Sequence, residues 1–176
     1  MKRLPFLAVA VVCLLAFGRG VAAGCGDKFV LIGGGARVNR SKFPSRVLVF
    51  MNPGSRIPAA EKEFHVEATL AAAGHKTKVV ESEAEVEKAL ASGQYDLVLA
   101  DLADVPRLQK ECSSSASKPA VLPLLYKPTA AELAAAEKEA NCLARPSKRS
   151  SDLLAVIDET MQSRQKGASP NCPPPR

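Results

Sequence analysis

The sequence predicts an α/β fold in which helices cover both faces of a parallel, doubly wound sheet of five strands. Short apolar runs of strand length alternate with segments whose apolar residues recur at helical spacing, and this order builds a parallel sheet with right-handed crossovers. Aromatic residues are only 5% of the chain and tryptophan is absent, so aliphatic side chains must form the core. A length of 176 residues suits one domain with short tails.

The first 23 residues have the three parts of a secretory signal peptide. Lys2 and Arg3 form the basic region, residues 4–17 the apolar region, and the small residues that end at Ala23 the cleavage site. The apolar region is shorter than the roughly 20 residues that span a bilayer, which favours cleavage over a retained anchor. We therefore expect an exported protein, secreted or periplasmic.

Cys25 offers an alternative to free secretion. The segment Ala22-Ala23-Gly24-Cys25 resembles the lipobox of bacterial lipoproteins, although Ala22 stands where leucine is usual. The resemblance implies lipidation of Cys25 and a periplasmic domain that touches the membrane only through this anchor. Both alternatives stay open.

The charge of the mature chain gives no reason to expect a nucleic-acid partner. Removal of residues 1–23 takes away three basic residues and no acidic one, which lowers the formal net charge from +6 to +3. The remaining basic residues form no stripe interleaved with aromatic residues, which is the pattern that nucleic-acid binding favours.

Residues 24–45 are expected to form a linker that contains one short strand, 29–32. The glycine cluster 33–35 follows this strand. We do not expect a nucleotide-binding loop there, because the spacing is not G-x-G-x-x-G and no helical pattern begins after it.

The domain is expected to span residues 46–165. Its five strands are predicted at 46–50, 76–80, 96–100, 120–126 and 143–144. Pro123 interrupts the fourth strand, and we expect distortion there because proline lacks a ladder donor.

Five helices are predicted between and after these strands, at 58–73, 83–91, 105–112, 130–141 and 151–163. Pro58 suits the first turn of the first helix. Thr129 and Glu132 have the spacing of a capping box for the fourth. Residues 166–176 are rich in proline and are predicted to form a disordered tail.

Four cysteines remain after removal of the leader. They form no C-x-x-C pair, and the chain has two histidines, so no metal site of known spacing is expected. In an oxidising compartment, cysteines commonly pair. Cys112 and Cys142 end the third and fourth helices, which we expect at the same edge of the sheet, so we predict a disulfide between them. A Cys25–Cys172 bond would tie the tails together unless Cys25 is lipidated.

Two stretches of the domain carry a resemblance to a known family. The first comprises residues 70–80 and 95–102, and the second comprises residues 142–146 with the helix that follows. Residues 46–165 resemble the receiver (response regulatory) domain of bacterial two-component response regulators, which has a flavodoxin-like fold. The resemblance makes Asp101, at the end of the third strand, the counterpart of the aspartate that accepts a phosphoryl group in a phosphorelay.

The sequence departs from the receiver pattern at the other site positions. Met51 and Asn52 stand where an acidic pair would hold Mg²⁺. Leu125 or Tyr126 stands where a threonine or serine is expected, and Arg145 replaces the lysine that would neutralise phosphoryl charge. The resemblance therefore implies a degenerate receiver in which Asp101 is inactive. Export favours the same conclusion, because no ATP-driven histidine kinase operates outside the cytoplasm.

Asp101 also has a structural interpretation. Its carboxylate can be held by Arg145 or Lys127, or it can cap the helix that follows. We favour such a role over phosphorylation, because the metal ligands that would offset phosphoryl charge are missing.

Four basic residues are expected on loops at the carboxyl edge of the sheet, where α/β folds bind ligands. They are Lys127, Arg145, Lys148 and Arg149. They are candidates for binding an anion or a partner, with a solvated rim as the alternative.

We predict an exported, non-catalytic receiver-like domain (a pseudo-receiver) that signals by binding a protein of the cell envelope, without phosphorylation. It is expected to use no cofactor and no metal. One alternative is a flavodoxin-like protein or enzyme that binds a small anionic ligand. A second is a genuine response regulatory domain that accepts phosphate on Asp101.

Overall fold

The computed structural model describes residues 29–32, 36–168 and 172. The expected signal peptide (1–23), Cys25 and the glycine cluster 33–35 lie outside the described residues. No helix of the described part is long and apolar enough to cross a membrane.

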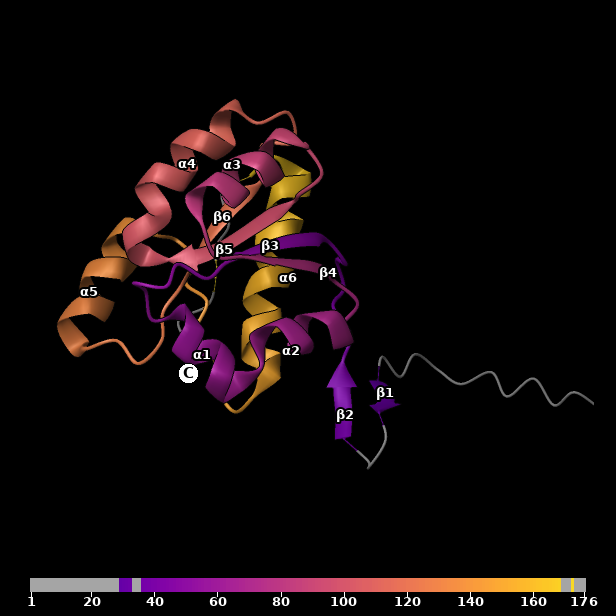
Figure 1. The fold of residues 1–176 in the computed structure, drawn as a ribbon. Coiled ribbons are helices and arrows are strands. Elements are labelled where there is room, and N and C mark those ends of the chain that lie inside the picture. The colour runs from indigo at the N-terminus through magenta and orange to yellow at the C-terminus, as the bar shows by residue number, and fades with distance from the viewer. Residues whose placement is uncertain (1–28, 33–35, 169–171, 173–176) are drawn as a thin grey trace, which may run out of the picture.

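Four parallel strands form the central sheet, in the order β4-β3-β5-β6 (Figure 1). They are β3 (Arg46–Phe50), β4 (Lys76–Val80), β5 (Leu97–Asp101) and β6 (Ala120–Leu124). The prediction of an α/β fold with a parallel sheet is confirmed. β3 and β4 have the predicted bounds, β5 is shifted by one residue, and β6 ends two residues early.

The predicted fifth strand is reduced to a single parallel bridge between Leu124 and Ala144. Ala144 donates its N–H to the carbonyl of Pro123, and Leu125 donates to the carbonyl of Ala144, both at 2.8 Å. The next rung on either side would need an N–H from Pro123 or from Pro146, and proline has none. The expected distortion at Pro123 thus takes the form of a ladder that cannot extend.

Six helices lie around the sheet in the described part. They are α1 (Ile57–Phe64), α2 (Val66–Ala72), α3 (Glu83–Ala91), α4 (Val105–Ser114), α5 (Ala130–Glu139) and α6 (Ser150–Lys166), with a short 3₁₀ turn η1 (Leu102–Asp104) before α4. Pro58 lies in the first turn of α1, and the Thr129–Glu132 capping box of α5 is present, as predicted.

The prediction of one helix over 58–73 is wrong, because the chain breaks it at His65. This residue adopts a left-handed conformation with φ 48°, and its N–H donates to the carbonyl of Glu61 at 2.8 Å. A left-handed residue closes one helix and redirects the chain. Two short helices, α1 and α2, therefore replace the predicted one.

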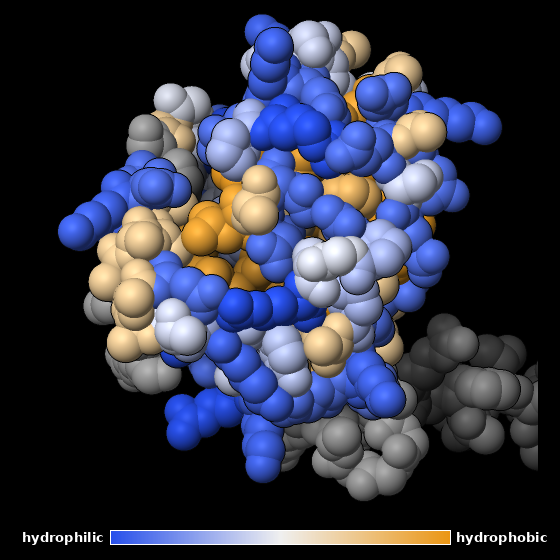
Figure 2. Space-filling view, turned by 60° about the vertical axis from the view of Figure 1, so that its left-hand side comes forward, coloured by the Kyte–Doolittle hydropathy of each residue, from blue (hydrophilic) through white to orange (hydrophobic). Residues whose placement is uncertain are grey.

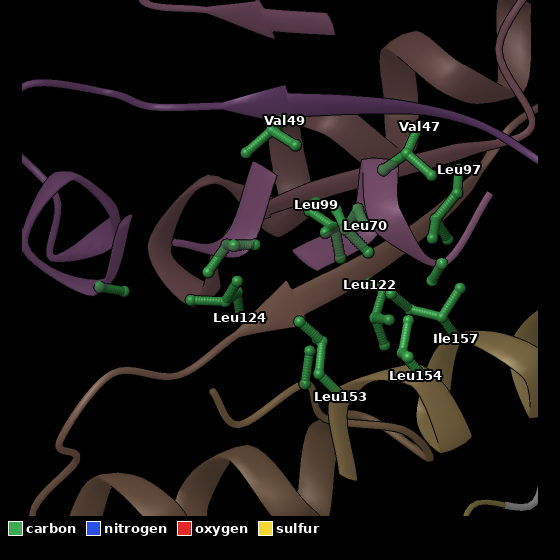
Figure 3. Packing of buried hydrophobic residues seen from close by; sticks show 14 of the residues in the cluster. Val47, Val49, Leu70, Leu97, Leu99, Leu122, Leu124, Leu153, Leu154 and Ile157 are labelled. Atoms are coloured by element: carbon green, nitrogen blue, oxygen red, sulfur yellow. The ribbon is translucent and has the colours of Figure 1, made fainter. Parts of the chain in front are cut away.

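Alternate residues of the strands face two separate apolar clusters, one on each side of the sheet. One cluster packs β3, β5 and β6 against α1, α2 and α6 (Figure 3); it includes Val47, Val49, Leu70, Leu97, Leu99, Leu122, Leu124, Leu153, Leu154 and Ile157. The other packs the sheet against α3 and α4; it includes Leu48, Phe50, Val86, Val98, Ala100 and Leu108. Helices thus cover both faces, as Figure 1 also shows.

Residues before the central sheet form a hairpin of two antiparallel strands. β1 (Phe29–Ile32) is the short strand that the sequence predicts, and it pairs with β2 (Ala36–Asn39). β2 falls within residues 24–45, which the sequence predicts to be a linker with a single strand. Figure 1 shows the hairpin beside the domain, as a sheet separate from the central one.

The disulfide joins Cys142 to Cys172, so the predicted Cys112–Cys142 bond is wrong, and so is the Cys25–Cys172 bond expected in the absence of lipidation. Cys112 is a free, buried thiol in the cluster under α3 and α4, whereas Cys142 belongs to the cluster on the opposite face. The sheet therefore separates the two residues. Cys172, within the tail predicted to be disordered, is tied to the domain and packs at Val156 of α6.

Candidate functional site

Asp101 ends β5 at the carboxyl edge of the sheet, and backbone amides hold its carboxylate. One oxygen accepts the N–H of Ala103 at 3.2 Å and so caps η1, while the other accepts the N–H of Arg56 at 3.3 Å. Within the described residues, neither Arg145 nor Lys127 forms an ion pair with Asp101. Of the structural roles predicted for this aspartate, capping the following turn is confirmed.

Asn52 lies at the end of β3, where a receiver would carry metal-binding carboxylates. Its Nδ2 donates to both carboxylate oxygens of Asp104 at 3.3 Å, and its Oδ1 accepts the N–H of Gly54 at 3.0 Å. Its carbonyl accepts the hydroxyl of Ser55 at 2.7 Å. One end of the side-chain amide therefore shapes the turn, and the other end ties the turn to η1. The preceding residue, Met51, packs against the apolar core.

Among the described residues, no group of three or more histidine, cysteine, aspartate or glutamate side chains is arranged to hold a metal ion. At the carboxyl edge the amide of Asn52 presents N–H donors to a carboxylate, and donors of this kind cannot ligate a cation.

The first residue after β6, Leu125, is buried against Ala136 of α5 and Leu143. The next two residues face α1 and not Asp101. The hydroxyl of Tyr126 and the Nζ of Lys127 both donate to one oxygen of Glu63 at 2.6 Å. These contacts lower the pKa of Glu63, with Lys127 as the larger cause, and they raise the pKa of Lys127. The hydroxyl of Tyr126, which occupies one of the two positions expected for the threonine or serine of a receiver, is thus bound to Glu63 of α1.

Arg56 joins the start of α1 to the start of α5. Its guanidinium donates to both carboxylate oxygens of Glu132, at 2.6 and 3.1 Å, and to the carbonyl of Lys127 at 3.4 Å. The hydrogen bond from Arg56, together with the capping bonds from Thr129, lowers the pKa of Glu132 to about 2. This planar, two-bond geometry is the arrangement that arginine favours with carboxylates.

The four basic candidates do not share a bonding partner in the described structure. Lys127 is paired with Glu63, Arg145 is half-buried, and Lys148 and Arg149 are exposed. Lys148 contributes its charge to Glu63 and lines a hollow of about 270 Å³ between α1, α2 and the start of α6. The hollow is lined by Glu63, Phe64, Val66, Thr69, Pro146, Ser147, Lys148, Ser150 and Leu153.

Acidic side chains therefore stand among the cations, and the edge is not a uniformly positive surface. Figure 2, which brings the α5 side forward, shows hydrophilic side chains spread over this face with apolar ones between them.

Arg107 of α4 forms a third charged group, which is not among the predicted site residues. Its guanidinium lies 2.8 Å from Glu111, 3.5 Å from Glu83 and 3.9 Å from Asp104, and its Cζ is 5.5 Å from the centre of the Phe50 ring. The spacings of Arg107 from Asp104 and from Glu111, three and four residues, are the sequence signals for this group. It links α3, η1 and α4 at the end of β3.

A comparison of the chain with models of known protein families finds no match, and comparisons with curated proteins and with solved structures find none either. The site is thus defined by its geometry: a strand-end aspartate held by amides, beside ion pairs that occupy Arg56, Lys127 and Arg107.

Proposed function

We propose that this chain is an exported, non-catalytic receiver-like domain of doubly wound, flavodoxin-like topology, which acts by binding a protein partner in the cell envelope without phosphorylation. The observation that carries the proposal is the state of Asp101. It lies where a receiver holds its phosphoacceptor, yet its carboxylate serves as a cap.

The strand order supports the likeness to a receiver. In the order β4-β3-β5-β6 the chain adds β4 on one side of β3 and then adds β5 and β6 on the other side, all parallel. The residues after β3 and β5 lie at the crevice that this change of side creates, where such folds place their sites. Asn52 and Asp101 occupy these two strand ends. The bridge at Ala144 stands in the place of a fifth strand, and Arg145 follows it.

The electrostatics of this edge oppose phosphoryl transfer. A phosphoryl group brings negative charge that Mg²⁺ and a free cation must offset. Asn52 donates its amide N–H groups to Asp104, Lys127 is paired with Glu63, and Arg56 is paired with Glu132. Arg145 supports the likeness by its position alone. These ion pairs and hydrogen bonds favour a single conformation of the carboxyl edge over one that changes when a ligand binds.

The test is incubation of the purified protein with Mg²⁺ and acetyl phosphate, followed by intact-mass spectrometry and peptide mapping. We expect no added phosphoryl group. Phosphorylation of Asp101 in the wild-type protein would refute the proposal and would favour the genuine phosphorelay domain.

A matched variant tests whether positions 51, 52 and 101 correspond to the acidic pair and the phosphoacceptor of a receiver. Met51→Asp with Asn52→Asp restores the acidic pair, and acceptance of phosphate by this variant, lost again when Asp101→Asn is added, would support descent from a working receiver. For the binding role, crosslinked partners from the envelope fraction should be the same for wild type and Asp101→Asn, with or without acetyl phosphate.

Export is part of the proposal and has its own measurement. The mass of the mature N-terminus distinguishes cleavage after Ala23 from lipidation of Cys25.

A further inference from the structure

His75 is a buried ionisable side chain at the amino edge of the sheet, opposite Asp101. It lies between α2 and β4, and its backbone N–H donates to the carbonyl of Leu70 at 3.0 Å. Only 5% of the surface of the residue is exposed. In the described part of the chain no aspartate, glutamate, lysine or arginine is buried. His75 is therefore the buried group there whose ordinary pKa lies nearest neutral pH.

The contacts of the ring assign its protonation state. Nδ1 accepts the N–H of Ser45 at 3.2 Å and lies 2.9 Å from the Ser45 hydroxyl. A nitrogen that accepts an N–H carries no proton, so the proton of the neutral ring is on Nε2. Nε2 is buried and has no hydrogen-bond partner among the described residues. Protonation would place an N–H on Nδ1 against the N–H of Ser45, and would bury a charge.

Ser45 ends the segment that connects β2 to β3, residues 40–45, which we call the connector. Asp158 of α6 accepts the N–H groups of Lys42 and Phe43 at 3.0 and 3.2 Å and the hydroxyl of Ser41 at 2.5 Å. Asp158 thus holds the middle of the connector. At its end, His75 holds the N–H and hydroxyl of Ser45, while the carbonyl of Ser45 accepts the N–H of Lys76 at 2.9 Å.

We propose that the His75–Ser45 contact is a pH-sensitive latch, which holds the connector on the domain when the ring is neutral and releases its end when the ring is protonated. The inference goes beyond the proposed function and does not depend on it. It rests on the burial of the ring, the two donors of Ser45 aimed at Nδ1, and the unpartnered Nε2.

The charges around the ring set the direction of the response. Burial is the largest influence and lowers the pKa of His75 below its ordinary 6.5, while Asp158 on α6 acts in the opposite direction. Lys42, Arg46 and Lys76, on the connector and the two strands beside it, are exposed. Because the pKa is lower in the latched state than in the released one, proton uptake favours release. Release therefore grows as the pH falls below about 6.5.

The chain offers a matched pair of variants, because it contains two histidines. His75→Asn keeps an acceptor near the position of Nδ1 but cannot be protonated. His65→Asn removes the other imidazole, which is exposed and left-handed, a conformation that asparagine tolerates. Amide hydrogen exchange of Ser45 is measured on the full chain from pH 7.5 to 5, with correction for the intrinsic exchange rate.

In the wild type and in His65→Asn, the opening constant at Ser45 should rise by a factor that approaches about tenfold per pH unit below pH 6.5, the limit for one linked proton. In His75→Asn it should be constant. Equal pH dependence in His75→Asn, or none in the wild type, would overturn the proposal.

A second measurement on the wild type covers the case in which His75→Asn does not fold. In an NMR titration the His75 imidazole should titrate below the ordinary histidine pKa of 6.5, because the ring is buried. Titration of His75 at or above pH 6.5 would overturn the proposal as well.

Discussion

Reduction of the Cys142–Cys172 disulfide should lower the free energy of unfolding by about 3.5 kcal/mol. The bond spans 30 residues, and closing a loop of this length removes entropy from the unfolded chain worth about that amount in the chain-entropy treatment. The closed loop contains all of α6, which supplies Leu153, Leu154 and Ile157 to the core. The cross-link therefore restrains the element that covers one face of the sheet.

The measurement is equilibrium unfolding in urea with and without a reductant. Cys172→Ala removes the bond at a half-buried position and leaves Cys142 in place, so this variant should unfold at a lower urea concentration and should not respond to the reductant. Cys112→Ala is the matched control. Cys112 is buried and unpaired, so its loss should weaken packing but preserve the difference between oxidised and reduced protein.

Two results would refute this reasoning. One is an unfolding midpoint of the wild type that does not change with reductant. The other is a non-reducing peptide map that links Cys112 to Cys142, because the sheet would then not separate these residues. Burial raises the pKa of the Cys112 thiol to about 11, which also predicts slow alkylation of this residue in the folded protein.

Two further predictions concern the carboxyl edge. Asp101→Ala should destabilise the protein by about 1 kcal/mol in urea unfolding, because it removes a cap, whereas Asp101→Asn should lose less because an acceptor remains; equal losses would contradict the capping role. Glu132 has a pKa that is lower folded than unfolded, so its contribution is complete above about pH 4.5 and is lost as the pH falls towards about 2. Glu132→Gln should flatten the pH dependence of the urea midpoint in that window, and 1 M salt should weaken the effect because Glu132 and Arg56 are solvent-accessible; an unchanged slope would argue against the ion pair.

Elements with strong local signals could be predicted from the sequence. β3 and β4 are apolar or alternating runs bounded by turn residues, and α3 ends at Ser92-Gly93; all three have the predicted bounds. The capping box of α5 was also predictable, because its two residues are three apart in the chain.

Features set by distant residues could not be predicted in the same way. The apolar spacing continues across His65, so only the left-handed backbone reveals the break. To predict that the fifth strand is reduced to one bridge, one would have to know the register of the pairing. In that register Pro123 and Pro146 are the residues whose N–H groups would be needed for the next hydrogen bonds on either side. To predict the disulfide pairing, one would have to know which face of the sheet each cysteine occupies. The positions of the helix ends in the sequence do not indicate this.

The candidate site divides along the same line. The capping role of Asp101 was among the predicted alternatives, because an aspartate before a turn is a local signal. The partners of Arg56 and Lys127 were not found, since they lie 76 and 64 residues away in the chain. The sequence placed basic residues at this edge, but only the structure shows which of them are neutralised.

The two edges of the sheet thus differ in how they can respond to their surroundings. At the carboxyl edge, solvent-accessible ion pairs join α1 to α5 and to the end of β6, and such pairs persist over the pH range in which both partners stay charged. At the amino edge, a single buried imidazole is the acceptor for Ser45, and one proton removes that capacity. If the domain changes with its environment between pH 5 and 7, the change should begin at His75, while Asp101 and the residues around it keep their arrangement.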